Sequence, residues 1–407
     1  MIYSKFKQAE IGELPEGWKQ ATLGDISSDI SYGYTASASD GPVGPKFLRI
    51  TDIQNDYVDW HSVPYCQISD DNRVKYQLDS GDICIARTGA STGTNYTVKE
   101  KVDAVFASYL IRYKINRSVA DPFYIGFLLK SSKWKDFVSS IIGGSAQPGA
   151  NAKQFASFEF FLPALSEQRA IAKILSNLDE KIELNHQMNK TLEAMCQALF
   201  KRWFVDEDRN STIGRLGDIL EVIESGTRPK GGIDPSLREG VPSIGAENID
   251  GIGFYDYSKT KFITAEFFNL MNRGLIKDYD VLVYKDGAYI GRKSMFGKGF
   301  PFEKCCVNEH VFILRTNSRA NQFFLYFLLN QEELKQLNTN SAQPGLNQES
   351  MRSLRIIIHN KIKVDRFGEV VKPLIDGIFI NCNQARILSK IRDSLLPKLM
   401  SGKIRVK

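Results

Sequence analysis

The sequence is poor in the residues and segments that mark metal-binding, secreted and membrane proteins. Its 407 residues include 4 His and 6 Cys, with no C-x-x-C pair and no His at metal-ligand spacing, so neither a zinc site nor a disulfide framework is encoded. We expect the cysteines to be reduced packing residues. No run of about 18 apolar residues occurs, and the first residues lack the apolar stretch of a signal peptide. These absences predict a cytoplasmic protein without a membrane segment.

Charge of one sign is not in large excess, since the formal net charge is +6. Lys and Arg against Asp and Glu number 17 against 18 in residues 1–166, 19 against 17 in residues 209–360, and 11 against 4 in residues 361–407. A protein that holds DNA alone through many phosphate contacts is expected to have a strongly basic face. The composition therefore argues against a self-sufficient DNA binder and leaves room for a partner that supplies positive charge.

What the sequence does contain is a long internal repeat with an offset near 196 residues. Residues 145–149, Ser-Ala-Gln-Pro-Gly, return unchanged as residues 341–345, and Leu23–Ile26 returns as Leu216–Ile219. The strand-like segment 81–89 matches 279–287, and each runs into a glycine-containing turn. Each half therefore predicts short strands and turns, one apolar helix, and the repeated loop.

Both halves are followed by apolar residues at the heptad spacing of a coiled coil. A helix from Ser166 to Val205 would be about 60 Å long, which suits a spacer, and we expect the two helices to pair antiparallel with Asn185 and Asn381 near a pseudo-twofold axis. The alternative is that each is an amphipathic core helix of its own domain. The seam positions are Ile171, Leu175, Leu178, Ile182, Asn185, Asn189, Leu192, Cys196 and Leu199 in the first helix, and Phe367, Val371, Leu374, Ile378, Asn381, Ala385, Leu388, Arg392 and Leu395 in the second.

No motif predicts catalysis. Residues 121–124, Asp-Pro-Phe-Tyr, resemble the Asp/Asn-Pro-Pro-Tyr motif of adenine methyltransferases, but their repeat counterpart is Asn-Gln-Phe-Phe at 321–324. What the two share is a helix N-cap. There is no convincing glycine-rich loop for S-adenosylmethionine and no Walker lysine, and the charged run Asp179-Glu180-Lys181 is expected to face water. We therefore predict no catalytic residue, no metal and no cofactor.

These patterns predict an α+β protein with two repeated mixed α/β domains, residues 1–165 and 209–360, separated by two long helices, residues 166–208 and 361–407, that pair as an antiparallel coiled coil. The chain resembles the specificity subunits of Type I restriction-modification enzymes over nearly its whole length. The resemblance rests on Glu13-Leu14-Pro15-Glu16-Gly17-Trp18, on residues 161–172 (Phe-Leu-Pro-Ala-Leu-Ser-Glu-Gln-Arg-Ala-Ile-Ala), and on residues 225–230 (Ser-Gly-Thr-Arg-Pro-Lys). The second junction, residues 357–361, lacks the Pro-x-x-x-x-Glu-Gln-Arg pattern, which leaves the start of the last helix open.

The resemblance implies a non-catalytic subunit that binds double-stranded DNA at a split site, one recognition domain per half-site. It also implies docking of two methyltransferase subunits and, through the complex, of restriction subunits. Polar, aromatic and cationic loop residues are the candidates for reading bases, whereas Gln147 and Gln343 in the repeated loop are expected to hold structure or meet a phosphate. The candidate DNA-binding residues are Tyr32, Tyr34, Thr35, Arg87, Thr88 and Ser91 in the first domain, and Thr227, Arg228, Lys230, Lys285, Tyr289, Arg292 and Lys293 in the second.

Two other functions fit parts of the sequence. A fused methyltransferase-specificity enzyme would need a cofactor-binding domain, for which this length leaves no room. A coiled-coil scaffold that binds only protein would use the long helices without any DNA reading. Binding of S-adenosylmethionine would indicate the first, and failure to shift DNA even beside a methyltransferase subunit would indicate the second.

Overall fold

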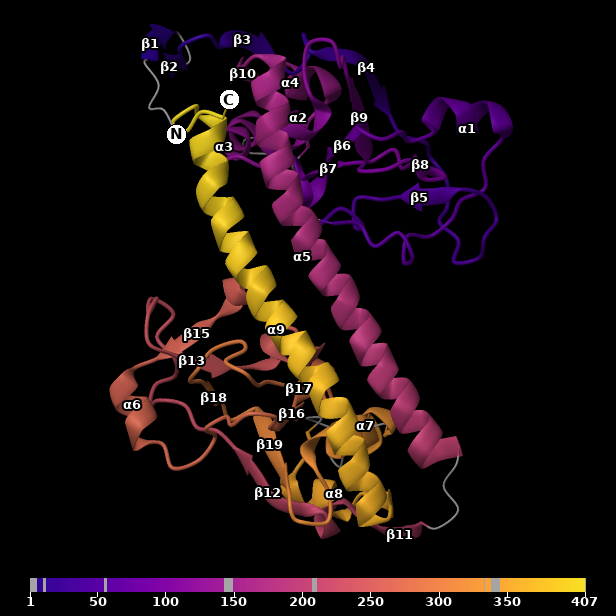
Figure 1. Cartoon of the computed structure of the whole chain (residues 1–407), viewed down its shortest axis with the longest axis vertical. Coiled ribbons are helices and arrows are strands. Elements are labelled where there is room, and N and C mark those ends of the chain that lie inside the picture. Colours follow the sequence, from indigo (N-terminus) through magenta and orange to yellow (C-terminus); the bar gives the residue numbers. More distant parts are fainter. Residues whose placement is uncertain are drawn as a thin grey trace. The chain divides into compact units, whose positions relative to one another are not determined.

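The computed structural model describes residues 6–9, 12–54, 57–142, 149–206, 211–332, 334–337 and 345–406 (Figure 1). Gln147 and Gln343 lie outside these residues, as do all but the final glycines of the two repeated loops. The chain forms two compact units: unit 1 is Met1–Glu183 with Leu388–Lys407, and unit 2 is Leu184–Ile387. Across the described part of the chain, no helix is long and apolar enough to cross a membrane.

Unit 1 is built on a four-stranded antiparallel sheet with the order β4-β9-β6-β7. Strand β6 is buried at all four positions, as its uninterrupted apolar sequence predicts. Smaller pairs are the parallel β5·β8, the antiparallel β3·β10 and the hairpin β1·β2. The strands are β1 Phe6–Ala9, β2 Gly12–Pro15, β3 Lys19–Thr22, β4 Ser27–Tyr32, β5 Lys46–Leu48, β6 Ile83–Ala86, β7 Asn95–Thr97, β8 Ala104–Phe106, β9 Leu110–Ile115 and β10 Glu159–Leu162, and the helical segments are α1 Asp70–Tyr76, η1 Gly89–Ser91, α2 Pro122–Leu128, α3 Ser132–Ile141 and α4 Ala152–Ala156.

Unit 2 repeats this plan with a five-stranded sheet, β12-β19-β16-β17-β14, beside a three-stranded one, β15-β13-β18. The pair β11·β20 corresponds to β3·β10, and the parallel pair β13·β18 to β5·β8. The strands are β11 Thr212–Arg215, β12 Leu220–Ser225, β13 Val241–Ile244, β14 Gly251–Ile252, β15 Lys261–Ile263, β16 Val281–Tyr284, β17 Lys293–Met295, β18 Cys306–Val307, β19 Val311–Thr316 and β20 Arg355–Ile358. The helical segments are η3 Leu216–Asp218, η4 Ala246–Asn248, η5 Tyr257–Lys259, α6 Ala265–Leu270, η6 Gly287–Tyr289, α7 Gln322–Gln331, η7 Leu334–Leu337 and α8 Gln348–Ser353.

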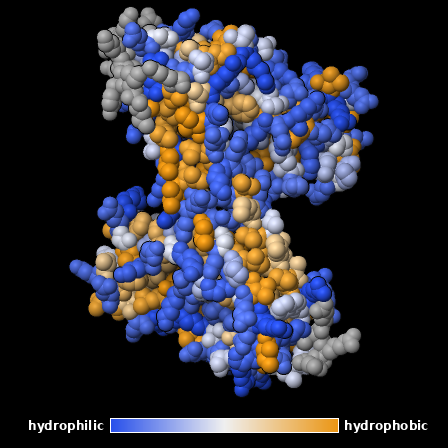
Figure 2. Space-filling model, viewed as in Figure 1, coloured by the Kyte–Doolittle hydropathy of each residue, from blue (hydrophilic) through white to orange (hydrophobic). Residues whose placement is uncertain are grey.

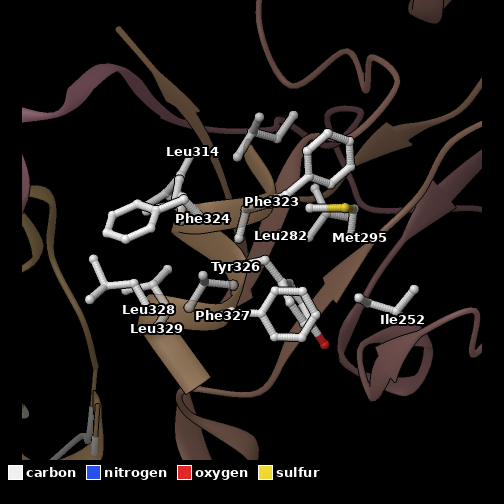
Figure 3. Packing of buried hydrophobic residues seen from close by; sticks show 14 of the residues in the cluster. Ile252, Leu282, Met295, Leu314, Phe323, Phe324, Tyr326, Phe327, Leu328 and Leu329 are labelled. Atoms are coloured by element: carbon white, nitrogen blue, oxygen red, sulfur yellow. The ribbon is translucent and has the colours of Figure 1, made fainter. Parts of the chain in front are cut away.

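The core of unit 2 forms where α7 packs on the sheet. Seven consecutive α7 residues, Phe323 to Leu329, are buried, and Figure 3 shows several of them beside Leu282 of β16, Met295 of β17 and Leu314 of β19. A helix that is apolar all round has no face for water and must be enclosed. The apolar helix predicted for the second half is therefore confirmed as a central core element.

The helices α2 and α7 begin at the predicted caps. The Asp121 carboxylate accepts hydrogen bonds from the backbone N–H groups of Phe123 and Tyr124, each at 3.0 Å. The Asn321 side chain accepts one from Phe324 N–H at 2.9 Å. Tyr124 is fully buried, so residues 121–124 form a capped core helix, and their likeness to a methyltransferase motif has a structural explanation.

The two long helices are α5, Leu165–Phe200, which continues into a π-helical segment at Lys201–Asp206, and α9, Lys361–Met400. In unit 1 the early part of α5 contacts the late part of α9, since Asp179 pairs with Arg392 at 2.8 Å. In unit 2 a later part of α5 contacts an earlier part of α9, where Asn185 Nδ2 donates to Gln384 Oε1 at 3.0 Å. The helices are therefore antiparallel, as predicted.

Polar side chains interrupt the seam where the prediction put them. Asn381 Nδ2 donates to Asn189 Oδ1 at 2.9 Å, and Asn185 Nδ2 lies 3.4 Å from the Asn381 carbonyl oxygen. Asn185 and Asn381 are buried. Because the N–H donors of Asn185 and Asn381 find these acceptors only when the residues are opposite each other, this layer favours one register over slipped alternatives.

Different side-chain hydrogen bonds stabilise the starts of the two long helices. The Gln168 side chain, fully buried, donates to the Pro163 carbonyl at 2.9 Å and accepts from Asp121 N–H at 2.8 Å. In contrast, α9 starts after Asn360, whose Oδ1 accepts from Ile362 N–H at 2.9 Å. An asparagine cap thus replaces the Pro-x-x-x-x-Glu-Gln-Arg pattern and sets the boundary that the sequence left open.

Residues after α9 complete unit 1. The Arg405 guanidinium makes a two-point ion pair with the Glu167 carboxylate, at 2.6 and 2.7 Å, and donates to the Glu16 carbonyl at 2.9 Å. Its guanidinium carbon lies 5.7 Å from the ring centroid of Trp18. The Glu167 side chain is buried, so Arg405 compensates a charge that would otherwise be costly to bury.

The expectation that Asp179-Glu180-Lys181 faces water is wrong for Asp179, which is 8% exposed. Its carboxylate lies 2.8 Å from Arg392 and 3.7 Å from Lys130. Asp179 directly follows the seam residue Leu178, on the flank of the helix that the folded domain covers. The heptad pattern marks only apolar seam positions, so it did not reveal that an acidic residue beside the seam is buried between Arg392 of α9 and Lys130 of the domain.

Candidate nucleic-acid interface

The candidate residues of unit 1 gather where β4 and β6 end. Tyr32, 44% exposed, ends β4, and the Arg87 guanidinium carbon lies 5.3 Å from its ring centroid. Arg87 Nε donates to the Ser108 carbonyl at 2.9 Å, and the Tyr32 hydroxyl accepts from Ala152 N–H at 3.0 Å. These contacts hold a cation and an aromatic ring together at one edge, a pairing that can contact phosphates or bases.

The other candidates of unit 1 follow Tyr32 or Arg87 within a few residues of the sequence, and their side chains differ in exposure to solvent. Thr88 bridges to Gly149, the final glycine of the first repeated loop, so this glycine lies at the same edge. Ser91 lies in η1, whose first residue, Gly89, has a φ of +76° that favours glycine. Thr35 is exposed, whereas the partly buried Tyr34 packs against the ring of Tyr76 at 5.3 Å.

Unit 2 has an edge built in the same way. Lys285 N–H donates to the His310 carbonyl at 3.0 Å, as Arg87 N–H donates to the Tyr109 carbonyl at 3.0 Å. Asp286 bridges to Gly345, as Thr88 bridges to Gly149. These matched bonds confirm the repeat at the level of single residues and pair Lys285 with Arg87, Asp286 with Thr88, and His310 with Tyr109.

The exposed cations of unit 2 are held by neighbours on this edge and beside it. Arg228 Nε lies 3.0 Å from Glu309 Oε1, and the Arg228 side chain is still 61% exposed. The Arg292 guanidinium carbon lies 4.3 Å from the ring centroid of Tyr289. Thr227 is partly buried and Lys230 is exposed. Guanidinium groups so placed can donate to guanine or phosphate oxygens.

Two candidates of unit 2 are directed toward the protein. Lys293 Nζ donates to the Leu329 carbonyl at the end of α7, at 2.7 Å, and burial lowers the pKa of its ammonium group. Lys285 Nζ lies 5.2 Å from the ring centroid of Phe312. The Lys293 side chain therefore joins β17 to α7, and the Lys285 ammonium group lies over an aromatic ring of its own domain, whereas Arg228 stays exposed at the edge.

Sequence reasoning missed three residues of the unit 2 edge: Asp286, Glu309 and His310. His310 Nδ1 lies 2.7 Å from Asp286 Oδ2, and its Nε2 lies 3.2 Å from Glu309 Oε1. His310 was not among the candidates, because no His in the sequence is at metal-ligand spacing. Their positions in the sequence could have indicated them. Asp286 directly follows the candidate Lys285, and Glu309-His310 directly precede the buried strand β19.

We searched the described residues for groups that could hold a metal ion and for reactive thiols. Within the described ranges, no group of three or more His, Cys, Asp or Glu is placed to hold a metal ion. All six cysteines are free and buried. Burial raises the pKa of the Cys196 and Cys382 thiols to about 12, so both are poor nucleophiles at neutral pH.

Comparisons with known proteins agree with this architecture. A family model for the Type I restriction modification DNA specificity domain matches residues 15–194 and 209–365. The Type I restriction enzyme HindI specificity subunit of Haemophilus influenzae is 30% identical over 464 residues, covering 95% of this chain and 99% of that protein. The MjaIX specificity subunit of Methanocaldococcus jannaschii is 25% identical over 449 residues, covering 99% and 97%.

Among solved structures, the crystal structure of the Type I restriction-modification S subunit from M. genitalium has a similar fold. It matches with a TM-score of 0.61 at 15% identity and covers 98% of this chain and 99% of that one. Both halves of the chain match the same family domain, and the two long helices follow them as the sequence predicted. The chain belongs to the family of Type I restriction-modification specificity subunits.

Proposed function

We propose that each repeated domain reads one half of a bipartite double-stranded DNA site while the paired helices set the gap between the halves. The recognition domains of this proposal are residues 1–165 and 209–360, and the spacer helices are residues 166–208 and 361–407. The observation that supports it is a pair of edges with the same backbone bonds and different side chains. A common scaffold with different donors and acceptors is what reading two different half-sites requires.

The side chains for this reading are the candidates on the two edges, with Tyr32, Arg87 and Thr88 at one and Arg228 at the other. Arginine donates to guanine O6 and N7, and hydroxyl groups can bond to several bases. In this proposal Lys293 contributes to folding, because its ammonium group is committed to the Leu329 carbonyl. The chain itself catalyses no reaction and acts in the cytoplasm, where a restriction-modification complex meets its DNA.

We propose further that the long helices dock two methyltransferase subunits, which bring in the restriction subunits. Exposed apolar side chains on these helices support this, because neighbouring apolar side chains left on a surface commonly mark a site that a partner covers. Leu184 and Ile380, and likewise Met195 and Ile391, are related by the offset of 196 residues that relates the two halves. A repeated apolar row suits two copies of one subunit.

The exposed apolar residues can be located on each unit separately. Figure 2 shows apolar side chains gathered over the part of α9 that belongs to unit 1. On α5 and α9 the exposed large apolar residues are Ile174 and Ile391 in unit 1, and Leu184, Met188, Met195, Ile362, Val370, Ile380 and Ile387 in unit 2, with exposures from 37% to 71%. Replacing Met188 or Ile387 with Glu should abolish co-purification of the methyltransferase subunit, whereas Val74→Glu on α1, 83% exposed, should leave it unchanged.

Expression in a host without other DNA methyltransferases tests the reading function. With methyltransferase subunits, the chain should yield one bipartite methylated motif, and the chain alone should yield no methylation and no cleavage. Gel shifts should show DNA binding that strengthens when methyltransferase subunits join. Methyl transfer by the pure chain would favour a fused enzyme, and an absence of DNA binding in the full complex would favour a scaffold.

A further inference from the structure

The edge of unit 2 has a connected set of charged side chains that the edge of unit 1 lacks. Glu309 Oε1 lies 3.0 Å from Arg228 Nε and 3.2 Å from His310 Nε2. His310 Nδ1 lies 2.7 Å from Asp286 Oδ2. The Glu309 side chain is 29% exposed, and its second oxygen, Oε2, has no partner among the residues that the structure describes. One carboxylate oxygen is thus fixed while the other is available.

This charged set is not needed to fold the turn. The matched backbone bonds place Thr88, Ser108 and Tyr109 of unit 1 at the positions of Asp286, Glu309 and His310. Unit 1 forms the same turn with two hydroxyl side chains and an aromatic one. Because the backbone is formed without the charges, the reason for a carboxylate at position 309 has to be sought outside the turn.

A carboxylate is an unfavourable side chain on a surface that meets only phosphates, because like charges repel. It is favourable where it accepts a hydrogen bond from an exocyclic amino group, which cytosine presents at N4 and adenine at N6 in the major groove. The Arg228 guanidinium, 3.0 Å from Oε1, offsets part of the charge of the carboxylate, and His310 lies on the same oxygen. This offset reduces the electrostatic penalty of bringing the carboxylate near DNA.

We propose that Glu309 is a specificity-determining residue, whose Oε2 accepts a hydrogen bond from the amino group of one cytosine or adenine in the half-site read by the second domain. This inference rests on the proposed function, because the unit 2 edge has to face DNA. It extends that function by naming the residue that reads, the atom that accepts the hydrogen bond, and the class of base, one with an exocyclic amino group. The two possible bases differ in how they respond to an amide, which provides the test.

Methylome sequencing of the full complex with Glu309→Ser and Glu309→Gln provides that test. Serine is the residue that unit 1 uses at this position, so Glu309→Ser should fold. It should reduce the preference for one base by about fivefold or more, at one position of the second half-site only. If that base is cytosine, Glu309→Gln should shift the preference to adenine, because an amide pairs with adenine N6 and N7. If it is adenine, Glu309→Gln should keep it.

Three results would overturn the assignment. One is an unchanged motif with unchanged selectivity in Glu309→Ser, and another is complete loss of methylation in both variants despite normal folding. The third is the same loss of base preference in the control variant Glu221→Gln. This substitution alters an exposed carboxylate at the start of β12, whereas Arg228 follows the end of that strand. A wild-type complex that produced no bipartite motif would instead refute the proposed function, so the two failures are distinguishable.

Discussion

Lengthening both helices by one heptad should lengthen the gap between the half-sites and leave their bases unchanged. The boundary between the units shows where to insert: between Glu183 and Leu184 in α5, and between Ile387 and Leu388 in α9. Both insertions leave the Asp179–Arg392 pair and the Asn185–Asn381 layer intact. Seven residues turn the helix by almost two full turns, so the seam stays nearly in phase.

The expected size follows from helix and duplex geometry. Seven residues add about 10 Å at 1.5 Å per residue, and duplex DNA rises about 3.4 Å per base pair, so the gap should grow by up to about three base pairs. Three base pairs also rotate the second half-site by about 100° around the duplex, so methylation should become slower unless the domains can swing.

Methylome sequencing reports the bases and the gap of the site separately. The control is an insertion in α5 alone, which leaves seven residues without a partner and should abolish methylation. A double insertion that changed the bases of either half-site would refute the division of labour between helices and edges. So would a fully active variant with an unchanged gap.

Other substitutions test the reading edge and the stability of the fold. Lys230→Ala should weaken or alter only the second half-site and leave the gap unchanged, as methylome sequencing would show. Asp179→Ala should cost about 2 kcal/mol of unfolding free energy, because Arg392, 13% exposed, loses its ion pair with a buried carboxylate and keeps the one with the exposed Asp393; urea unfolding measures this, and a double variant with Arg392→Met should recover most of it. Burial alone would raise the pKa of Asp376, but hydrogen bonds from Lys372 and from the Tyr279 hydroxyl lower this pKa below its ordinary value. The stabilisation from Asp376 is therefore present above the unfolded pKa of about 4 and is lost as pH falls below it, so the stability difference between wild type and Asp376→Asn should shrink in acid.

The fold could be predicted largely because the chain repeats itself. Residues 81–89 and 279–287 occupy equivalent strands and turns, and the heptad spacing identified both long helices and their antiparallel pairing. The exact start of α9 could not be predicted, since one asparagine side chain sets it and asparagine is common in loops. Burial of Asp179 escaped prediction because it depends on partners far away in the sequence, Arg392 of α9 and Lys130 of the domain.

The candidate edges could be predicted as regions more readily than as residues. Glycine turns after β6 and β16 led to Arg87 and Lys285, which the structure places at equivalent positions. Side-chain direction depends on packing that no short pattern encodes, and so Lys293 was grouped with readers although it joins β17 to α7. Glu309 was missed because its repeat counterpart is a serine, so the repeat gave it no emphasis.

Unit 1 is made of two segments from opposite ends of the chain, and this affects the order in which the two units can fold during synthesis. Unit 2 is one continuous segment, whereas unit 1 needs residues 388–406, and among these the buried Leu399 and Met400 belong to its core. Arg405, the partner of buried Glu167, is made after all of unit 2. The ribosome therefore presents the earlier recognition domain first, but we expect it to stay incomplete until the later one has emerged. Pulse proteolysis of stalled chains should find unit 2 protected before unit 1, so chaperones that shield exposed apolar surface would be needed most by the half that is translated first.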